Sequence, residues 1–144
     1  MSQADDQPTR APHGQPVEFR VPARLESLAV IRALVTALGT LEDLDLDAVA
    51  DLRLALDEAC TALIRSAAPD SRLTVTVRPR EHDLLVSVST PCEHENALRP
   101  GTFSWHVISS LTHDVETFRD GADVGAGCSV FGITMTAKRL DSTR

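Results

Sequence analysis

The sequence predicts an α+β fold, a two-layer sandwich in which helices cover one face of a mixed, largely antiparallel sheet. Two segments, 24–38 and 45–66, carry apolar residues at the spacing of three and four that one face of a helix requires. Two others, 72–78 and 84–89, alternate apolar and polar residues on either side of a turn, as a β-hairpin does. Because helices and strands are grouped along the chain, a sheet covered on one face is the favoured architecture.

The chain is long enough for one domain with an aliphatic core. It has 144 residues, of which 42% are hydrophobic and only 3% aromatic. The expected organisation is a disordered N-terminal tail over 1–15, a single domain over 16–139 and a polar C-terminal tail over 140–144.

The first elements are a strand from Val17 to Val21, which Pro22 ends, and the helix 24–38. Gly39 follows the last apolar position of that helix and is expected to be its C-cap. The acidic run that comes next is expected to be a solvated loop, in which Asp45 or Asp47 caps the second helix. This run comprises Glu42, Asp43, Asp45 and Asp47.

The second half of the chain begins with a segment without periodicity, 90–102, which is expected to be a long loop. Long loops in compact domains are often functional. A short helix, a strand, a Gly-rich turn and a last strand are expected at 103–111, 115–118, 119–127 and 129–138.

Composition excludes several classes of function. The net charge of −7 and the absence of a Lys/Arg cluster argue against direct nucleic-acid binding, although an acidic surface suits a basic protein partner. No apolar run approaches the ~20 residues that cross a membrane, so no membrane span is expected. Three scattered cysteines indicate reduced thiols in a cytoplasmic protein, with a regulatory disulfide between Cys92 and Cys128 as the alternative. The histidines and cysteines lack zinc-site spacing, so no metal site is expected from them.

Glu58 is the residue that most invites a chemical role. It lies off the apolar stripe of the second helix and shares a helix face with Asp51 and Ala62. A carboxylate in a cleft can act as a general base or orient water on a magnesium ion. The alternative is that Asp57 and Glu58 solvate an exposed helix face.

The run Asp57-Glu58-Ala59-Cys60-Thr61 resembles the N-box of the histidine-kinase-like ATPase superfamily, in the version found in anti-sigma factors of the RsbW and SpoIIAB type. In that family the next residue is an Asn that supplies an oxygen ligand to the magnesium ion bound with ATP. Here it is Ala62, which has no such oxygen.

The family's glycine boxes are recognisable mainly by position. Thr90 and Cys92 stand where the first box has the adenine-binding Asp and a Gly, while Thr102 and Ser104 replace glycines of the second. The resemblance covers about residues 16–138 and implies a Bergerat-type fold with a degenerate ATP site. That site would comprise Glu58, Ala62, Thr90, Cys92, Gly101, Thr102, Ser104, Gly127 and Ser129.

The resemblance implies an anti-sigma factor that sequesters an alternative sigma factor of the stress or sporulation type. It also implies a STAS-domain anti-anti-sigma antagonist that releases the sigma factor, and a homodimer. Because phosphoryl transfer needs placed metal and phosphate contacts, we expect kinase activity to be weak or absent. The alternatives are an ATP- and magnesium-dependent serine/threonine kinase that acts on the antagonist through Glu58, and a small-molecule sensor that reuses the cleft. The first helix, with Arg24, Glu26 and Arg32 beside apolar residues, is expected to form the partner surface.

Overall fold

The structure is a computed structural model, and it describes residues 14–93, 98–120 and 129–139. It confirms the two-layer α+β sandwich, with a five-stranded sheet in the order β1-β2-β3-β5-β4. All four strand pairings among these residues are antiparallel, so this part of the sheet is antiparallel rather than mixed. The elements are β1 (Val17–Pro22), a 3₁₀ turn (Leu25–Ser27), α1 (Leu28–Leu41), α2 (Leu46–Ser66), β2 (Arg72–Pro79), β3 (Asp83–Cys92), α3 (Phe103–Leu111), β4 (Asp114–Asp120) and β5 (Ser129–Lys138).

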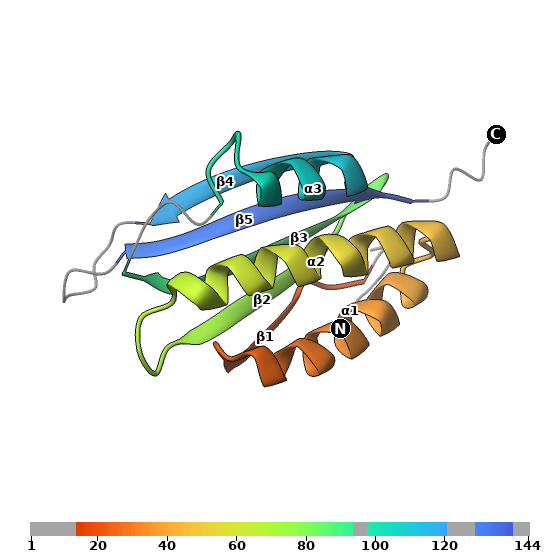
Figure 1. The fold of residues 1–144 in the computed structure, drawn as a ribbon. Coiled ribbons are helices and arrows are strands. Elements are labelled where there is room, and N and C mark those ends of the chain that lie inside the picture. The colour runs from red at the N-terminus through yellow and green to blue at the C-terminus, as the bar shows by residue number, and fades with distance from the viewer. Residues whose placement is uncertain (1–13, 94–97, 121–128, 140–144) are drawn as a thin grey trace, which may run out of the picture.

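The three helices lie on one face of the sheet, and α2 crosses its centre between α1 and α3 (Figure 1). The alternation in β2 puts Val75 and Val77 on the helix side, where they are at most 1% exposed. The stripe of α2 meets them with Leu52, Leu56 and Leu63, which are equally buried. One core therefore lies between the sheet and α2, and the other two helices flank it.

The first helix differs from its prediction at both ends. It begins with the 3₁₀ turn and continues past Gly39 to Leu41, so the expected C-cap is wrong. Gly39 is buried inside α1, and a Cβ there would lie 3.3 Å from side-chain atoms of both Leu44 and Val49. The glycine is needed for close packing of α1 on the following turn and α2. The chain reverses instead at Asp43, whose φ is 67°.

The remaining boundaries follow the sequence pattern closely. Asp45 caps α2, because its Oδ1 accepts a hydrogen bond of 2.7 Å from the Ala48 amide. The predicted hairpin is present, but β3 extends to Cys92 and shortens the predicted 90–102 loop. The extension exists because Thr90 to Cys92 still pair with β5.

Glu42 corrects the expectation of a solvated acidic run. It is 8% exposed, and its carboxylate lies 3.1 Å from Nη2 of Arg139, which follows β5. Arg139 also donates to the backbone oxygens of Glu42 and Arg80. The Gly14 amide donates to the same carboxylate, at 3.1 Å. The Glu42 carboxylate thus joins the α1–α2 turn to both ends of the described chain, by an ion pair to Arg139 and a hydrogen bond from Gly14.

We predict that Arg139→Met destabilises the protein by about 3 kcal/mol, because it leaves the Glu42 carboxylate without its buried partner. Arg20→Met is the control, since Arg20 pairs with Glu18 on the exposed face of β1. That change should cost less than ~1 kcal/mol. Urea unfolding of the two variants measures both, and equal losses would show that the Glu42–Arg139 pair has no special weight.

Candidate functional site

Two of the predicted motifs meet where α3 packs on α2. The Ser104 hydroxyl donates a hydrogen bond of 2.6 Å to Oε2 of Glu58, across 46 positions of sequence. Both side chains are half-buried. The structure therefore brings together the acidic residue of the N-box and a residue of the second glycine box, as the resemblance implies.

Asp57 points away from this contact, toward α1. Successive residues of a helix are turned by about 100°, so neighbouring carboxylates face different surroundings. Nε of Arg32 lies 2.8 Å from Oδ1 and 3.0 Å from Oδ2 of Asp57. Arg32, predicted to contact a partner protein, thus forms an ion pair within the chain, with 40% of its side chain still exposed.

Ala62 lies one helical turn beyond Glu58 and packs against the core. Its methyl group supplies no oxygen at the place of the family's magnesium ligand. Magnesium binds through oxygen ligands in near-octahedral geometry, so the replacement removes one ligand from the expected set. The α2 side of the site does not fit a magnesium ion held in the family's manner.

Thr90 and Cys92 face the interior at the end of β3. Thr90 is 1% exposed and its hydroxyl donates to the Arg72 backbone oxygen at 2.8 Å, which ties β3 to β2. Cys92 is also buried and its Sγ donates to the Thr90 backbone oxygen. The Thr90 hydroxyl therefore serves the sheet, and its predicted contact with a nucleotide base stays a prediction.

The start of α3 follows Gly101, whose φ of +95° is the left-handed conformation that glycine adopts readily. Thr102 caps the helix, since its hydroxyl oxygen accepts from the Trp105 amide at 3.2 Å. The same hydroxyl donates to the Arg99 backbone oxygen. Of the two predicted site residues nearest the C-terminus, Ser129 begins β5 opposite Cys92, while Gly127 lies outside the described residues.

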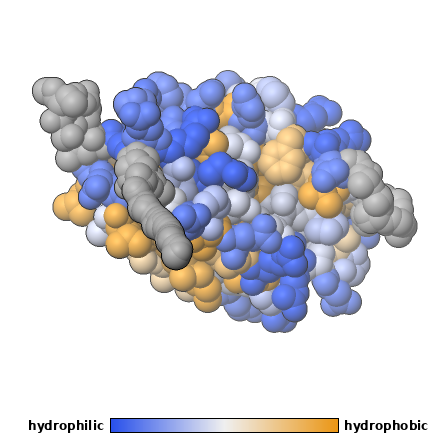
Figure 2. Space-filling model, turned by 180° about the vertical axis from the view of Figure 1, so that it is seen from behind, coloured by the Kyte–Doolittle hydropathy of each residue, from blue (hydrophilic) through white to orange (hydrophobic). Residues whose placement is uncertain are grey.

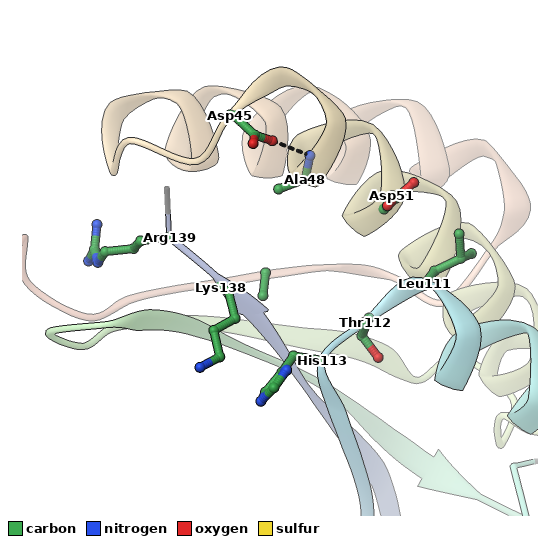
Figure 3. Close-up of a pocket in the computed structure, with 9 residues that line it drawn as sticks. Asp45, Ala48, Asp51, Leu111, Thr112, His113, Lys138 and Arg139 are labelled. Atoms are coloured by element: carbon green, nitrogen blue, oxygen red, sulfur yellow. Dashed lines mark hydrogen bonds between the residues drawn. The ribbon is translucent and has the colours of Figure 1, made fainter. Parts of the chain in front are cut away.

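A cavity of about 350 Å³ lies elsewhere, between the start of α2, the end of α3 and the end of β5 (Figure 3). None of the predicted site residues lines it. In Figure 3, Asp45 and Asp51 lie on the α2 side, while Lys138 and His113 extend together away from them. No local sequence pattern indicates this cavity, because its lining comes from three distant segments.

Cys60 is buried in α2, next to the candidate site. Burial, and secondly the negative charge of Asp57, raises the pKa of its thiol to about 12. The thiol is therefore neutral at physiological pH and poorly nucleophilic. The alternative disulfide of Cys92 with Cys128 is untested, since Cys128 lies outside the described part of the chain.

Comparison with known proteins places the chain in a family. Residues 21–126 match the sequence model of the histidine kinase-like ATPase domain. The chain belongs to the histidine kinase-like ATPase family. The chain is also 56% identical, over 128 residues, to a protein named anti-sigma-F factor RsbW from Mycobacterium tuberculosis, in strains CDC 1551 / Oshkosh and ATCC 25618 / H37Rv. The match covers 89% of this chain and 76% of each relative. The resemblance to RsbW-type proteins is thereby confirmed.

Within this family, the described site departs from what Mg-ATP requires in three places. Ala62 lacks the ligand oxygen, the Thr90 hydroxyl is used within the sheet, and the Glu58 carboxylate already accepts from Ser104. The family's scaffold is thus retained, whereas these three described residues do not offer the contacts that the family's motifs imply.

We predict that Ala62→Asn increases the affinity for ATP in the presence of magnesium by about tenfold, since it restores one metal ligand. Ala62→Leu is the matched control, because Leu has nearly the shape of Asn without its oxygen. Calorimetry with and without magnesium measures the effect. A wild-type chain that binds Mg-ATP at micromolar concentration, with no gain in Ala62→Asn, would contradict the assignment.

Proposed function

We propose that this chain is an anti-sigma factor that sequesters an alternative sigma factor by surface binding, without depending on kinase activity. Two relatives that are 56% identical to this chain carry the name anti-sigma-F factor RsbW, which supports the proposal. The observation that carries the proposal is an exposed apolar face on α1. Ala62 and the engaged Thr90 hydroxyl, which depart from the family's nucleotide motifs, support the independence from kinase activity, because a binding surface does not need those motifs.

The exposed face of α1 is formed by residues spaced three and four apart, so they line one side of the helix. We call it the α1 apolar surface, and it comprises Val30, Ala33, Leu34, Ala37 and Leu41. Leu41 is 74% exposed, Val30 48% and Leu34 39%. Hydrophobic residues also gather at the lower left of Figure 2, the view from behind, which corresponds to the lower right of Figure 1, where α1 lies.

A continuous apolar face that solvent touches is a common mark of a protein-binding site. The only charged residue of α1 is Arg32, and its guanidinium is paired with Asp57. The surface can therefore make mainly apolar contacts, which suits the hydrophobic centre of an interface. A stable interface of this kind typically buries ~800 Å² on each partner.

Charged residues stand at the N-terminal edge of this surface. Arg24 and Glu26 are both exposed and make no ion pair within the described chain, so they can contact a partner's polar rim. The net charge of −7 favours a partner with a basic surface. Arg24 and Glu26 thus remain in the proposed partner surface, whereas Arg32 acts through its contact with Asp57.

The finer parts of the proposal follow from the family. We propose that a STAS-domain antagonist releases the sigma factor, that the sigma factor is of the stress or sporulation type, and that the protein is a cytoplasmic homodimer. None of the helices described is both long and apolar enough to span a membrane. Co-purification from native cytosol with and without ATP identifies the partners, and light scattering measures the oligomeric state.

We predict that Leu34→Asp weakens binding to a sigma-F-type factor at least 30-fold, because it places a charge in the centre of the apolar surface. Leu46→Asp is the matched control, since Leu46 is 83% exposed at the start of α2, off this surface. Calorimetry without nucleotide compares the two. Equal affinities would remove the α1 apolar surface from the interface, and an ATP requirement for binding would contradict the nucleotide-independent mode.

A second prediction concerns the rim. Arg24→Glu should weaken binding about threefold, more at low than at high salt, because exposed charges act mainly through screened attraction. Arg20→Glu on β1 is the control of equal charge change. If reversal of Arg24 leaves the affinity and its salt dependence equal to those of the control, Arg24 lies outside the interface.

A further inference from the structure

The cavity at the start of α2 has walls of opposite charge that do not pair with each other. Asp45 and Asp51 belong to the α2 wall, whereas Lys138 and His113 come from the ends of β5 and α3 (Figure 3). No ion pair crosses the cavity within the described part of the chain, although exposed ion pairs form elsewhere on the protein. The volume of about 350 Å³ lies within the range of small-molecule sites.

Some polar groups around the cavity already have partners. Asp45 caps α2, the Thr112 hydroxyl donates to the backbone of α3, and Arg139 is held by its buried ion pair. By contrast, the carboxylate of Asp51 and the amine of Lys138 make neither a hydrogen bond nor an ion pair among the residues that the structure describes. These two side chains are therefore able to bind charged groups of a ligand.

The basic wall keeps its capacity for an anion. Asp83 is opposite Lys138 in the register of β3 and β5, but its two oxygens accept hydrogen bonds of 2.7 and 2.9 Å from Arg80. The pKa of Asp83 is lowered, first by Arg80 and then by the charges of Lys138 and His113. Asp83 thus offsets part of the positive charge without holding the Lys138 amine. The His113 imidazole can donate a second hydrogen bond in either protonation state.

The lining also has apolar members, namely Ala48 on α2, Leu111 on α3 and Ala137 on β5. A short apolar or amide body can pack on them, while charged groups at its two ends reach the two walls. An α-amino acid carries both charges on one carbon, so it fits this separation less well than a molecule with one charge at each end. A dipeptide has this form, because its ammonium and carboxylate groups end a short chain.

We propose that this cavity binds a short peptide with free termini, of about dipeptide size. Its ammonium group would meet Asp51, and its carboxylate would meet Lys138 and His113. The site does not depend on the sequestering role, since none of its residues belongs to the α1 apolar surface.

The cavity lies apart from the nucleotide motifs. Asp51 precedes Glu58 by about two turns of α2, and Leu111 ends α3 while Ser104 lies in its first turn. Ala137 lies near the end of β5, the strand that Ser129 begins. A peptide in the cavity would therefore leave Glu58 and Ser104 untouched, and ATP should not compete with it.

Titration of the isotope-labelled full chain with alanyl-leucine, followed by nuclear magnetic resonance, tests the site. Ligands of this size reach roughly millimolar affinity. Saturable shifts should be largest at the start of α2 and at the ends of α3 and β5, with or without ATP. If saturable shifts are absent from these segments, the proposal is wrong.

Two variants test the charged walls. Asp51→Asn and Lys138→Met should each weaken binding of alanyl-leucine about fivefold, the effect of one exposed charge pair. The matched controls are Asp47→Asn on α2 and Arg78→Met on β2, which remove equal charges from exposed positions outside the lining. They should change the affinity less than about twofold, because salt screens distant charges. Losses as large in the controls as in the cavity variants would overturn the proposal.

Blocked peptides assign each end of the ligand to its wall. N-acetyl-alanyl-leucine lacks the ammonium group, so it should bind Asp51→Asn as well as it binds the wild-type chain. Alanyl-leucinamide lacks the carboxylate, so it should bind Lys138→Met as well as the wild-type chain. If the wild-type chain binds all three peptides with equal affinity, neither wall recognises a terminus and the proposal fails.

Lys138 gives an independent readout, because it is the single lysine of the chain. Its acetylation by an amine-reactive ester can be followed by mass spectrometry, with the N-terminal amine as the internal reference. Alanyl-leucine at twice its dissociation constant should slow acetylation of Lys138 about threefold, since only the free chain reacts. Alanyl-leucinamide at the same concentration should protect less. Equal acetylation of Lys138 with and without alanyl-leucine would contradict its contact with the ligand.

Discussion

The packing of α2 is the constraint on which the rest of the structure depends. This helix of 21 residues presents one apolar stripe to the sheet and two flanks to its neighbouring helices. The stripe residues Leu52, Leu56 and Leu63 are almost completely buried, so the helix cannot rotate without exposing them. Its fixed rotation then decides which polar residues reach α1, which reach α3, and which reach solvent.

Because aliphatic contacts fix that rotation, the polar residues on the two sides of α2 can be replaced without loss of the helix packing. Asp57 and Glu58 are turned by about 100° from each other around the helix, so that one bonds to α1 and the other to α3. A family scaffold can therefore keep its fold while single polar residues of its cleft are replaced, as at Ala62. The binding surface proposed on α1 is compatible with such replacements, since it is built from different residues.

Most of the fold was predictable, because the signals were local. Alternation in β2 and β3 and the spacing of apolar residues in α2 follow directly from the period of each element. The C-terminus of α1 was not predictable, since a glycine after an apolar stripe normally ends a helix. Gly39 is instead required by the side chains of Leu44 and Val49, a tertiary contact that the local sequence does not reveal. Burial of Glu42 depends on Arg139, which is 97 positions away.

The candidate site was predictable only in part. The resemblance implied that Glu58 and Ser104 belong to one cleft, and the structure brings them into contact. The pairing of Arg32 with Asp57 was missed, because two charged residues 25 positions apart carry no local signal of their contact. The use of the Thr90 hydroxyl by β2 was missed for a similar reason, since the register of the hairpin decides it.

The contacts of Glu42 have one more consequence. Its carboxylate accepts from the backbone of Gly14 and from the side chain of Arg139, so the chain enters and leaves the folded part at the same point. Proteins whose ends lie this close accept circular permutation well. A short linker between residues 14 and 139, with a new opening in the exposed turn between β2 and β3, would preserve the strand pairings of the described residues and move both chain ends to that turn.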